Sequence, residues 1–308
     1  MVALEQDVRP PPGPFRLRAA DRDGVMRRRD GVLTRLIHHG DEPAVVRAWP
    51  VAGAVRVQAE APSRDAAAFG IERIRFALNV DHDLRPFRTQ FKRDPLLGPI
   101  VRRMPWIRPW RAAQPFQALA WAVTEQLIET EHAWEIQRRL AFRYGRRSTC
   151  GTLVDAPSAD TLAGRCQPEL QACDLSAGRS RALIEAARGV ARGRIDLDNP
   201  EDSRRRLIRI RGIGPWTVEK LGLHGQGDDD QLPAGDLAYI KLVGRLAGLG
   251  RRAEVHEVRE FFAPYEPFRA LAGVYMLVGA HSLAGPSDRP PLRRGPRPRR
   301  PGARAPRL

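Results

Sequence analysis

The residues best suited to a chemical role lie between positions 207 and 241, where a pair of glycines precedes a lone carboxylate. Gly212 and Gly214 flank Ile213 and allow the positive φ and the close approach that a tight hairpin between two helices needs. Pro215 suits the first turn of the following helix, because its missing N–H would have no partner there. The unpaired amides of that turn point back at the hairpin, so the segment predicts an anion-binding site.

Asp236 is the carboxylate, and it stands 24 residues after Gly212 at the predicted start of another helix. A carboxylate held in place at a helix start can stabilise a positive charge that develops on a bound molecule, and it can position an attacking water. The positive end of the helix dipole favours the ionised side chain at this position. The simpler interpretation is that Asp236 only caps the helix, as aspartate often does. The two roles are compatible.

The composition favours a polyanionic partner, because the formal charge of the chain is +16 at pH 7. Only three of the 52 basic residues are lysines, a skew that a GC-rich genome can also produce. Residues 286–308 hold eight arginines and one aspartate, about +7, so about +9 remains on the rest of the chain. The charge therefore supports nucleic-acid binding without establishing it.

Other features of the composition bear on the compartment. No run of 18 apolar residues is present, so we expect no membrane span. The first residues lack the apolar segment of a signal peptide. Three cysteines are odd in number and lack paired metal-ligand spacing, so we expect reduced thiols in the cytoplasm and no metal site.

The pattern of apolar residues predicts two different architectures along the chain. Short apolar runs between turn signals, starting with Phe15–Leu17, predict antiparallel strands over residues 15–60, and residues 66–77 predict a helix that crosses them. From Asp81 onward the apolar residues recur at intervals of three and four residues, which predicts helices. We therefore expect an α+β fold: a small N-terminal antiparallel sheet domain over residues 1–83, a larger all-helical body over residues 84–285 with the hairpin at 207–223, and a disordered Arg/Pro-rich tail over residues 286–308.

Two of the predicted helices carry candidate functional residues. One is predicted over Pro115–Thr130 and includes Gln126 and Leu127 near its end. The other begins at Asp236, and its predicted buried stripe consists of Leu237, Ile240, Val243 and Leu246.

The spacing around the hairpin resembles a known family. The pattern Leu207-x-x-Ile210-x-Gly212-Ile213-Gly214-x-Trp216-Thr217, followed by Leu232-Pro233-x-x-Asp236, is similar to the helix–hairpin–helix and catalytic aspartate of the base-excision DNA glycosylase superfamily. A Gly-Ile-Gly alone also occurs in helicases, ligases and nucleases. The Trp-Thr pair, the distance to the aspartate and the upstream Gln-Leu pair make the resemblance specific, above all to bacterial 3-methyladenine DNA glycosylase II. It covers roughly residues 84–284.

The resemblance implies roles for individual residues. Asp236 would be the catalytic carboxylate, and Gly212, Ile213, Gly214 and Thr217 would bind DNA. Relatives that also cut the DNA backbone carry a lysine nucleophile where this chain has Trp216. An indole cannot form a Schiff base but can stack on a flipped base, so hydrolysis without strand cleavage is implied, with Lys220 as the only rival amine. Trp216 could instead pack the hairpin onto the body.

The end of the helix predicted over Pro115–Thr130 carries the other implied roles. Gln126 would line the base pocket, and Leu127 would be the wedge that fills the gap in the DNA after base flipping. A mismatch-specific adenine glycosylase would carry a glutamate five residues before the glutamine, where this chain has Trp121. Leu127 could alternatively be a core leucine at a helix end.

The aromatic pocket of the family is only partly matched. Its aromatic positions fall on Leu237, Leu277 and Lys220, while Tyr239 and Tyr275 are near enough in sequence to substitute. By analogy, the hairpin could also hold a monovalent cation through the carbonyls of Ile208, Ile210 and Ile213; otherwise we expect no cofactor. Some relatives hold an iron–sulfur cluster with four cysteines after the helical body, but no cysteine follows Cys173.

The favoured hypothesis is a monofunctional DNA glycosylase of base excision repair. It would hydrolyse the N-glycosidic bond of alkylated purines such as 3-methyladenine and 7-methylguanine, flipped out of double-stranded DNA. It would act as a monomer in the cytoplasm, associated with the nucleoid. Two alternatives stay open: a glycosylase for other lesions, such as uracil or oxidised purines, and a non-catalytic helix–hairpin–helix DNA-binding protein.

Overall fold

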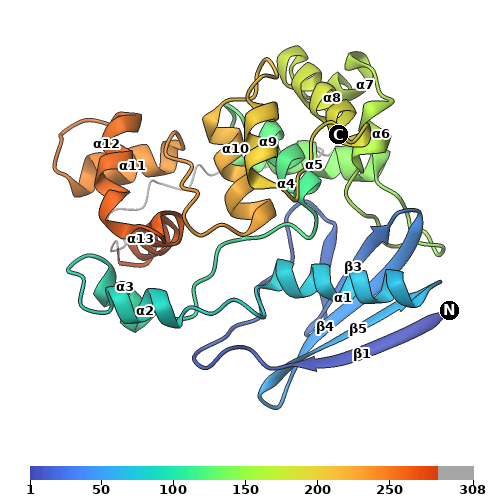
Figure 1. Cartoon of the computed structure of the whole chain (residues 1–308), viewed down its shortest axis with the longest axis horizontal. Helices are drawn as coiled ribbons and strands as arrows, with labels where there is room; N and C mark the ends of the chain where they lie inside the picture. Colours follow the sequence, from blue (N-terminus) through green and yellow to red (C-terminus); the bar gives the residue numbers. More distant parts are fainter. Residues whose placement is uncertain (284–308) are drawn as a thin grey trace, which may run out of the picture.

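The computed structural model describes residues 1–283 and arranges them as an N-terminal sheet layer beside two helical lobes (Figure 1). The predicted tail, residues 286–308, lies outside the described residues. Among the residues described, every helix is too short or too polar to cross a bilayer.

A five-stranded antiparallel sheet forms the N-terminal layer, as predicted, in the order β1-β5-β4-β3-β2. The first predicted strand was wrong, because Phe15–Leu17 is an irregular segment whose partly buried apolar side chains pack on the sheet core. The first strand is instead at the N-terminus, where only one of its residues is fully buried, so it has little apolar alternation. The strands are β1 (Val2–Val8), β2 (Met26–Arg29), β3 (Val32–His39), β4 (Glu42–Val51) and β5 (Ala54–Ala61).

One helix, α1 (Arg64–Leu78), crosses the sheet, which confirms the prediction for this region. Ser63 caps it by accepting a hydrogen bond from the amide of Ala66 at 3.1 Å. A Cβ added at Gly70 would lie 2.8 Å from Val46 Cγ2, so glycine lets the helix approach β4 closely. The helix ends at Asn79, whose side-chain amide donates to the carbonyl of Pro109 at 2.9 Å.

The first helical lobe carries the hairpin and has its own hydrophobic core. The helix predicted over Pro115–Thr130 ends early, at Thr124, and a turn leads into the next helix at Thr130. The lobe consists of α4 (Pro115–Thr124), α5 (Thr130–Tyr144), α6 (Ala159–Ala163), α7 (Gln167–Gln171), α8 (Ala177–Ala191), α9 (Pro200–Leu207), α10 (Pro215–Leu221) and a π-helical turn, η1 (Gly222–Gln226).

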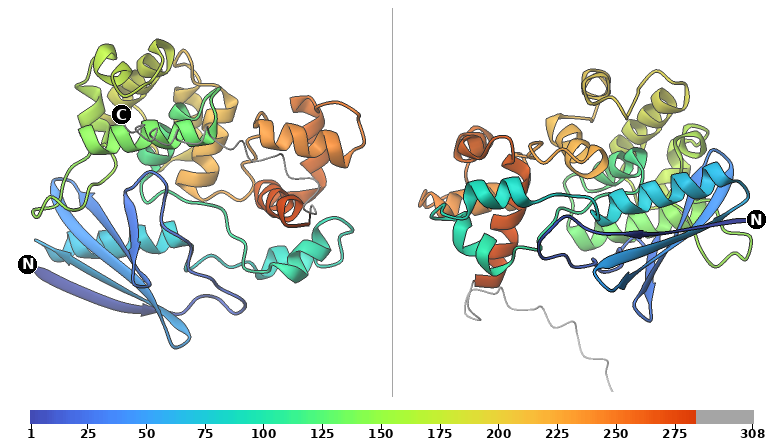
Figure 2. Two further views of the ribbon diagram at one scale, coloured as in Figure 1. Left: turned by 180° about the vertical axis from the view of Figure 1, so that it is seen from behind. Right: turned by 60° about the horizontal axis from the view of Figure 1, so that its bottom comes forward.

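The second helical lobe combines segments that are distant in the sequence. Phe87 packs against Tyr275 with ring centroids 4.9 Å apart, and Phe91 packs against Tyr265 at 5.4 Å. The region predicted as one helical body therefore holds two hydrophobic cores. Both views in Figure 2 show this lobe beside the hairpin lobe and away from most of the sheet. Its elements are α2 (Arg85–Phe91), α3 (Leu97–Arg103), α11 (Leu237–Leu246), α12 (Val255–Phe262), the 3-10 turn η2 (Ala263–Tyr265) and α13 (Arg269–Leu283).

Helix α11 buries Val243 of the predicted stripe and partly buries Ile240, but it leaves Leu237 and Leu246 exposed. Its buried side chains include Tyr239, Leu242 and Val243, which are spaced i, i+3 and i+4. Leu237 is 48% exposed and Leu246 39%, because α12 and α13 pack on the neighbouring face of the helix.

A buried polar network joins the sheet to the hairpin lobe. Arg35 of β3 donates to Gln117 Oε1 of α4 at 2.7 Å, and Arg35 Nη2 lies 3.6 Å from Asp155 Oδ1. Asp155 also accepts from the backbone amide of His38 at 3.1 Å and contacts its ring Nδ1 at 3.0 Å. Gln117 donates to Asp23 at 3.2 Å. All of these side chains are buried, so each charge depends on its partners in the network.

Replacing Asp155 by alanine should lower the free energy of unfolding by about 3 kcal/mol or more, because it leaves the buried Arg35 guanidinium uncompensated. Urea denaturation followed by circular dichroism measures the loss. Glu60→Ala is the matched control, since it removes an exposed ion pair with Arg47 and should cost less than about 1 kcal/mol. Equal losses for the two variants would contradict the importance of the network.

Candidate active site

The hairpin lies between α9 and α10 and contains the predicted glycines. Gly212 has a φ of +93°, as expected, whereas Gly214 has a φ of −110° and is the N-cap of α10. Ile213 is buried, and its amide donates to the carbonyl of Ile210 at 3.0 Å. A positive φ is therefore needed only at the first glycine. The second glycine leaves open space, because a Cβ added there would meet nothing within 4 Å.

The turn between α4 and α5 is hydrogen-bonded to the hairpin. Gln126 Nε2 donates to the carbonyl of Gly212 and to Thr217 Oγ1, both at 2.9 Å. The side chain of Gln126 thus holds the turn against the hairpin, and the buried Thr217 supports this contact from inside. The role of Gln126 in a base pocket stays a prediction.

Leu127, the next residue, projects from this turn. Its side chain is fully exposed and its φ is +56°. A positive φ is costly for a residue with a branched side chain, and exposure forgoes the burial that leucine normally gains. The interpretation of Leu127 as a core leucine is wrong. The exposure and the backbone conformation of Leu127 suit a side chain that inserts into a binding partner.

Asp236 and Trp216 come together at the start of α11. Asp236 is the N-cap: its Oδ1 accepts from the amide of Ala238 at 2.9 Å. Its Oδ2 accepts from Trp216 Nε1 at 3.3 Å. The carboxylate is half-buried and each of its oxygens has a donor. Helix capping and the indole contact therefore hold this carboxylate in one orientation.

Lys220 lies one turn beyond Trp216 on α10. Its Nζ is 5.4 Å from the centroid of the Trp216 ring and 2.8 Å from Glu125 Oε2. Burial opposes the ammonium charge, but the carboxylates of Glu125 and Asp236 outweigh it and raise the pKa of Lys220. The amine is therefore protonated at neutral pH and is not a nucleophile in this state.

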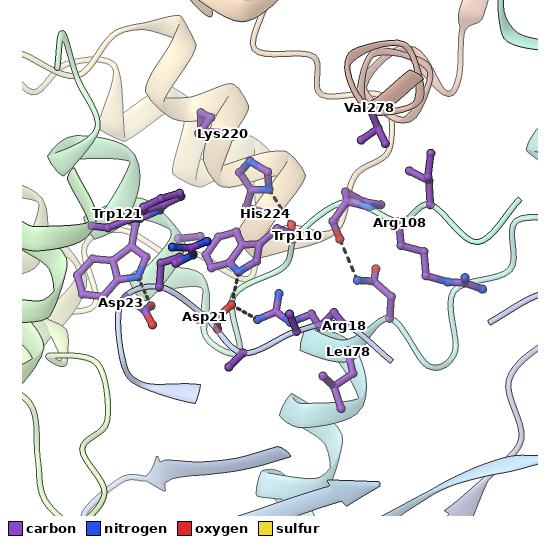
Figure 3. A pocket seen from close by; sticks show the side chains of 18 of the residues that line it. Arg18, Asp21, Asp23, Leu78, Arg108, Trp110, Trp121, Lys220, His224 and Val278 are labelled. Carbon is purple, nitrogen blue, oxygen red and sulfur yellow. Dashed lines mark hydrogen bonds and ion pairs between the residues drawn. The ribbon is translucent and has the colours of Figure 1, made fainter. Parts of the chain in front are cut away.

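A cavity of about 640 Å³ begins at Lys220 and Glu125 and lies where the sheet layer and the two lobes meet (Figure 3). Its size is typical of sites for small molecules or single bases. Four of the six tryptophans line it: Trp106, Trp110, Trp121 and Trp134. This aromatic lining was not predicted from the sequence, because these tryptophans belong to three separate segments that only the tertiary fold brings together.

Residues 16–23 form one wall of this cavity, and we call this segment the arginine strap. The guanidinium of Arg16 stacks 3.3 Å from the centroid of Trp106, and those of Arg18 and Arg22 lie 5.8 Å and 5.2 Å from the centroids of Trp110 and Trp134. Each cation–π contact adds attraction between strap and lobe. The strap thereby holds part of the aromatic wall from outside the helices.

Two aspartates of the strap fix the indoles through their N–H groups. Asp21 accepts from Trp110 Nε1 at 2.9 Å, and Asp23 accepts from Trp121 Nε1 at 2.7 Å (Figure 3). Burial, together with the nearby charge of Asp21, raises the pKa of Asp23. These contacts fix the orientation of the two indoles within the cavity wall.

His224 completes this side of the cavity. Its ring lies edge-on to Trp110 at 5.3 Å, and its Nδ1 is 2.7 Å from the carbonyl oxygen of Trp110. Burial, followed by the charge of Lys220, lowers the pKa of His224 to about 3. The ring is therefore neutral at physiological pH, and its Nδ1–H donates to the carbonyl.

The tyrosines that sequence reasoning proposed for the pocket lie elsewhere. Tyr239 is 3% exposed and packs edge-on against Phe262 at 5.9 Å, in the core of the second lobe. Tyr275 is fully buried in the same core. Neither residue lines the cavity, because the face of α11 that carries Tyr239 turns toward α12 and α13. Leu237, by contrast, is exposed next to Asp236.

The side chains that could bind a metal ion are dispersed over the described part of the chain. Within residues 1–283, no three His, Cys, Asp or Glu side chains are grouped as a metal site would require. The cation expected at the hairpin stays a prediction: the carbonyl of Ile210 already accepts from the amide of Ile213, which leaves it one lone pair, and nothing further distinguishes the carbonyls of Ile208 and Ile213.

A smaller hollow of about 350 Å³ lies between the end of α8 and the end of α9. Five arginines and one glutamate contribute its charged side chains: Arg188, Arg192, Arg194, Arg206, Arg209 and Glu185. It adjoins the hairpin and is strongly basic, as a surface that follows a phosphate backbone needs to be.

Three relatives resemble this chain. A DNA-3-methyladenine glycosylase of Bacillus subtilis is 25% identical over 205 residues, which are 64% of this chain and 68% of that protein. The probable bifunctional transcriptional activator/DNA repair enzyme AlkA of Mycobacterium tuberculosis is 30% identical over 211 residues, which are 65% of this chain but only 40% of that protein. The solved 3-methyladenine DNA glycosylase of Archaeoglobus fulgidus superposes with a TM-score of 0.73 at 18% identity, over 92% of this chain and 100% of that one. No family model matches the chain.

The fold and the arrangement of hairpin and aspartate are those of helix–hairpin–helix DNA glycosylases, and the chain is similar to members of that superfamily. Within the superfamily it is related to the 3-methyladenine DNA glycosylases, the name that the relatives from Bacillus and Archaeoglobus carry. The expected fold class and family are thereby confirmed.

The two hairpin glycines should respond differently to alanine. Gly212→Ala should cost about 1–2 kcal/mol of stability, because its positive φ disfavours a Cβ, which would also lie 3.3 Å from that of Ala182. Gly214→Ala should cost less than about 1 kcal/mol, mainly through a poorer helix cap. It should nevertheless weaken binding to undamaged duplex DNA severalfold, because the new methyl group occupies the space in front of the amides of α10.

Urea denaturation measures the first effect, and fluorescence anisotropy with a labelled duplex measures the second. A Gly214→Ala protein that binds DNA as tightly as the wild type would show that the hairpin does not contact the backbone.

Proposed function

We propose that this protein is a monofunctional DNA glycosylase that hydrolyses the N-glycosidic bond of alkylated purines flipped out of duplex DNA. The observation that carries the proposal is the Asp236–Trp216 contact: the Trp216 ring lies 5.4 Å from the ammonium of Lys220, and Lys220 lines the tryptophan-rich cavity. The names of the relatives support the same activity.

The proposed partner is double-stranded DNA with a damaged base. The amides at the start of α10 and the arginines of the basic hollow would hold the phosphate backbone. Leu127 would enter the stack where the base has left and offset the cost of unstacking. A relative from Schizosaccharomyces pombe, 26% identical with a TM-score of 0.52, was solved in complex with abasic DNA. That complex supports the proposal.

One copy of the chain suffices for this activity. The hairpin, the turn with Leu127, Asp236 and the cavity all belong to the same protomer, so we propose a monomer. The substrate places the protein with the chromosome, which for a bacterial enzyme means the cytoplasm and the nucleoid.

Alkylated purines suit the cavity because they are planar and positively charged. Stacking a cationic base on an indole face combines dispersion with cation–π attraction. A cationic base also leaves readily, because bond cleavage neutralises it rather than leaving an anion. An anionic Asp236 would then need only to stabilise the sugar cation and to position water for attack at C1′. Damaged bases that pair or stack poorly enter the cavity more easily, which adds selectivity.

Asp236→Asn tests the catalytic role cleanly, since asparagine is as good an N-cap as aspartate and should preserve α11. Release of 7-methylguanine should fall by about a hundredfold or more, the range seen when one key electrostatic group is removed from an active site. Affinity for the lesion-bearing duplex should stay within a few-fold. Single-turnover kinetics and anisotropy measure the two quantities.

Near wild-type turnover of this variant would exclude Asp236 as the catalytic group. A wild-type protein that binds duplex DNA but releases no base would instead indicate a non-catalytic DNA-binding protein.

The monofunctional mechanism predicts that borohydride traps no covalent adduct between protein and DNA. Trp216 has no amine, and the protonated Lys220 is paired with Glu125. The product strand should break only after treatment with alkali or heat, which denaturing electrophoresis shows. A trapped adduct that maps to Lys220 by mass spectrometry would overturn this mechanism.

A further inference from the structure

The Lys220–Glu125 ion pair is a feature of the cavity that the hydrolysis of cationic bases does not use. Both side chains line the cavity, one from α10 and one from the end of α4, and both are largely buried. The ammonium has three N–H donors, and the contact with Glu125 uses one of them. It also lies 5.4 Å from the face of Trp216, the residue that contacts Asp236. A donor is thus held between the aromatic cavity and the proposed catalytic carboxylate.

The chemistry of the leaving base decides when such a donor matters. A base that is already cationic leaves as a neutral molecule and needs no help. An uncharged purine leaves with the electron pair of the broken bond and is anionic until it is protonated. A buried charge-assisted hydrogen bond to such a base is stronger than one between neutral groups. It would act most on the transition state, where the charge develops.

We propose that Lys220 is a catalytic hydrogen-bond donor to the leaving base, and that it extends this enzyme's activity to uncharged purine lesions with a free ring nitrogen or carbonyl oxygen. The inference rests on the proposed glycosylase function. In the reaction, the bond between C1′ and the base nitrogen breaks and its electron pair stays on the base, stabilised by the ammonium. The oxygen of water bonds to C1′, and the proton that water releases neutralises the base, so water is the only other reactant.

Glu125 has the complementary role in this arrangement. Paired with Lys220 at 2.8 Å, it compensates the charge of that ammonium. A cationic alkylated purine is therefore repelled less by Lys220 than it would be by an unpaired lysine. The ion pair lets one cavity accept both classes of base, whereas a lysine alone would repel the cationic class.

The test compares hypoxanthine, an uncharged purine with a free N7, with 7-methylguanine, which is cationic and methylated at N7. Duplexes carrying each base are incubated with saturating enzyme, and base release is followed in single turnovers. In Lys220→Met the ratio of the rate on hypoxanthine to the rate on 7-methylguanine should fall at least tenfold. Lys220→Arg, which keeps a charged donor, should recover most of the ratio. Glu125→Gln should shift the ratio the other way by slowing release of 7-methylguanine.

The outcomes separate this inference from the function on which it rests. If the wild type releases neither base, the proposed glycosylase function fails. If it releases 7-methylguanine but not hypoxanthine, only the inference about Lys220 fails. If Lys220→Met slows the release of both bases by the same factor, Lys220 supports Trp216 structurally and does not act on the leaving base. Thermal denaturation of each variant, compared with the wild type, identifies a loss of rate that reflects unfolding.

Discussion

The buried carboxylate of Asp23 is the point at which the layers of this molecule are joined. It accepts hydrogen bonds from Trp121 and Gln117, and Gln117 in turn accepts from Arg35 of the sheet. Because these side chains are buried, each of them must stay in place for the others to remain satisfied. The position of a tryptophan in the cavity is thus tied to the packing of the sheet, and the N-terminal domain takes part in building the site.

A second series of contacts links the cavity to the proposed chemistry. Glu125 pairs with Lys220, Lys220 lies over the Trp216 ring, and Trp216 donates to Asp236. These residues come from α4, α10 and the start of α11, so the series crosses from one helical lobe to the other. Small displacements between the lobes would change both the orientation of the carboxylate and the shape of the cavity. Leu223 of the η1 turn, which belongs to the hairpin lobe, packs into the hydrophobic core of the second lobe and opposes such displacements.

Local signals in the sequence were enough for the parts of the site that depend on short-range structure. The hairpin and the N-cap at Asp236 follow from glycine, proline and aspartate chemistry within a few residues, and the structure has both. Strand β1 was missed because an edge strand with one buried residue lacks a clear alternation. The pocket tyrosines were misplaced because the rotation of α11 is set by α12 and α13. The tryptophan lining and the arginine strap depend on contacts between residues about 90 or more positions apart, which periodicity cannot reveal.

The arginine strap lies far in the sequence from the residues proposed to carry out the reaction. Its side chains shape one wall of the cavity, yet it lies in an irregular segment that makes no hydrogen-bonded ladder and is more than 180 residues from the hairpin in sequence. Irregular segments tolerate substitution and changes in length better than helices that pack on two sides. On the proposed function, variation confined to residues 16–22 would alter which bases the cavity admits while Asp236 and the hairpin remain unchanged. For protein engineering, this strap is where a library aimed at new lesions should begin.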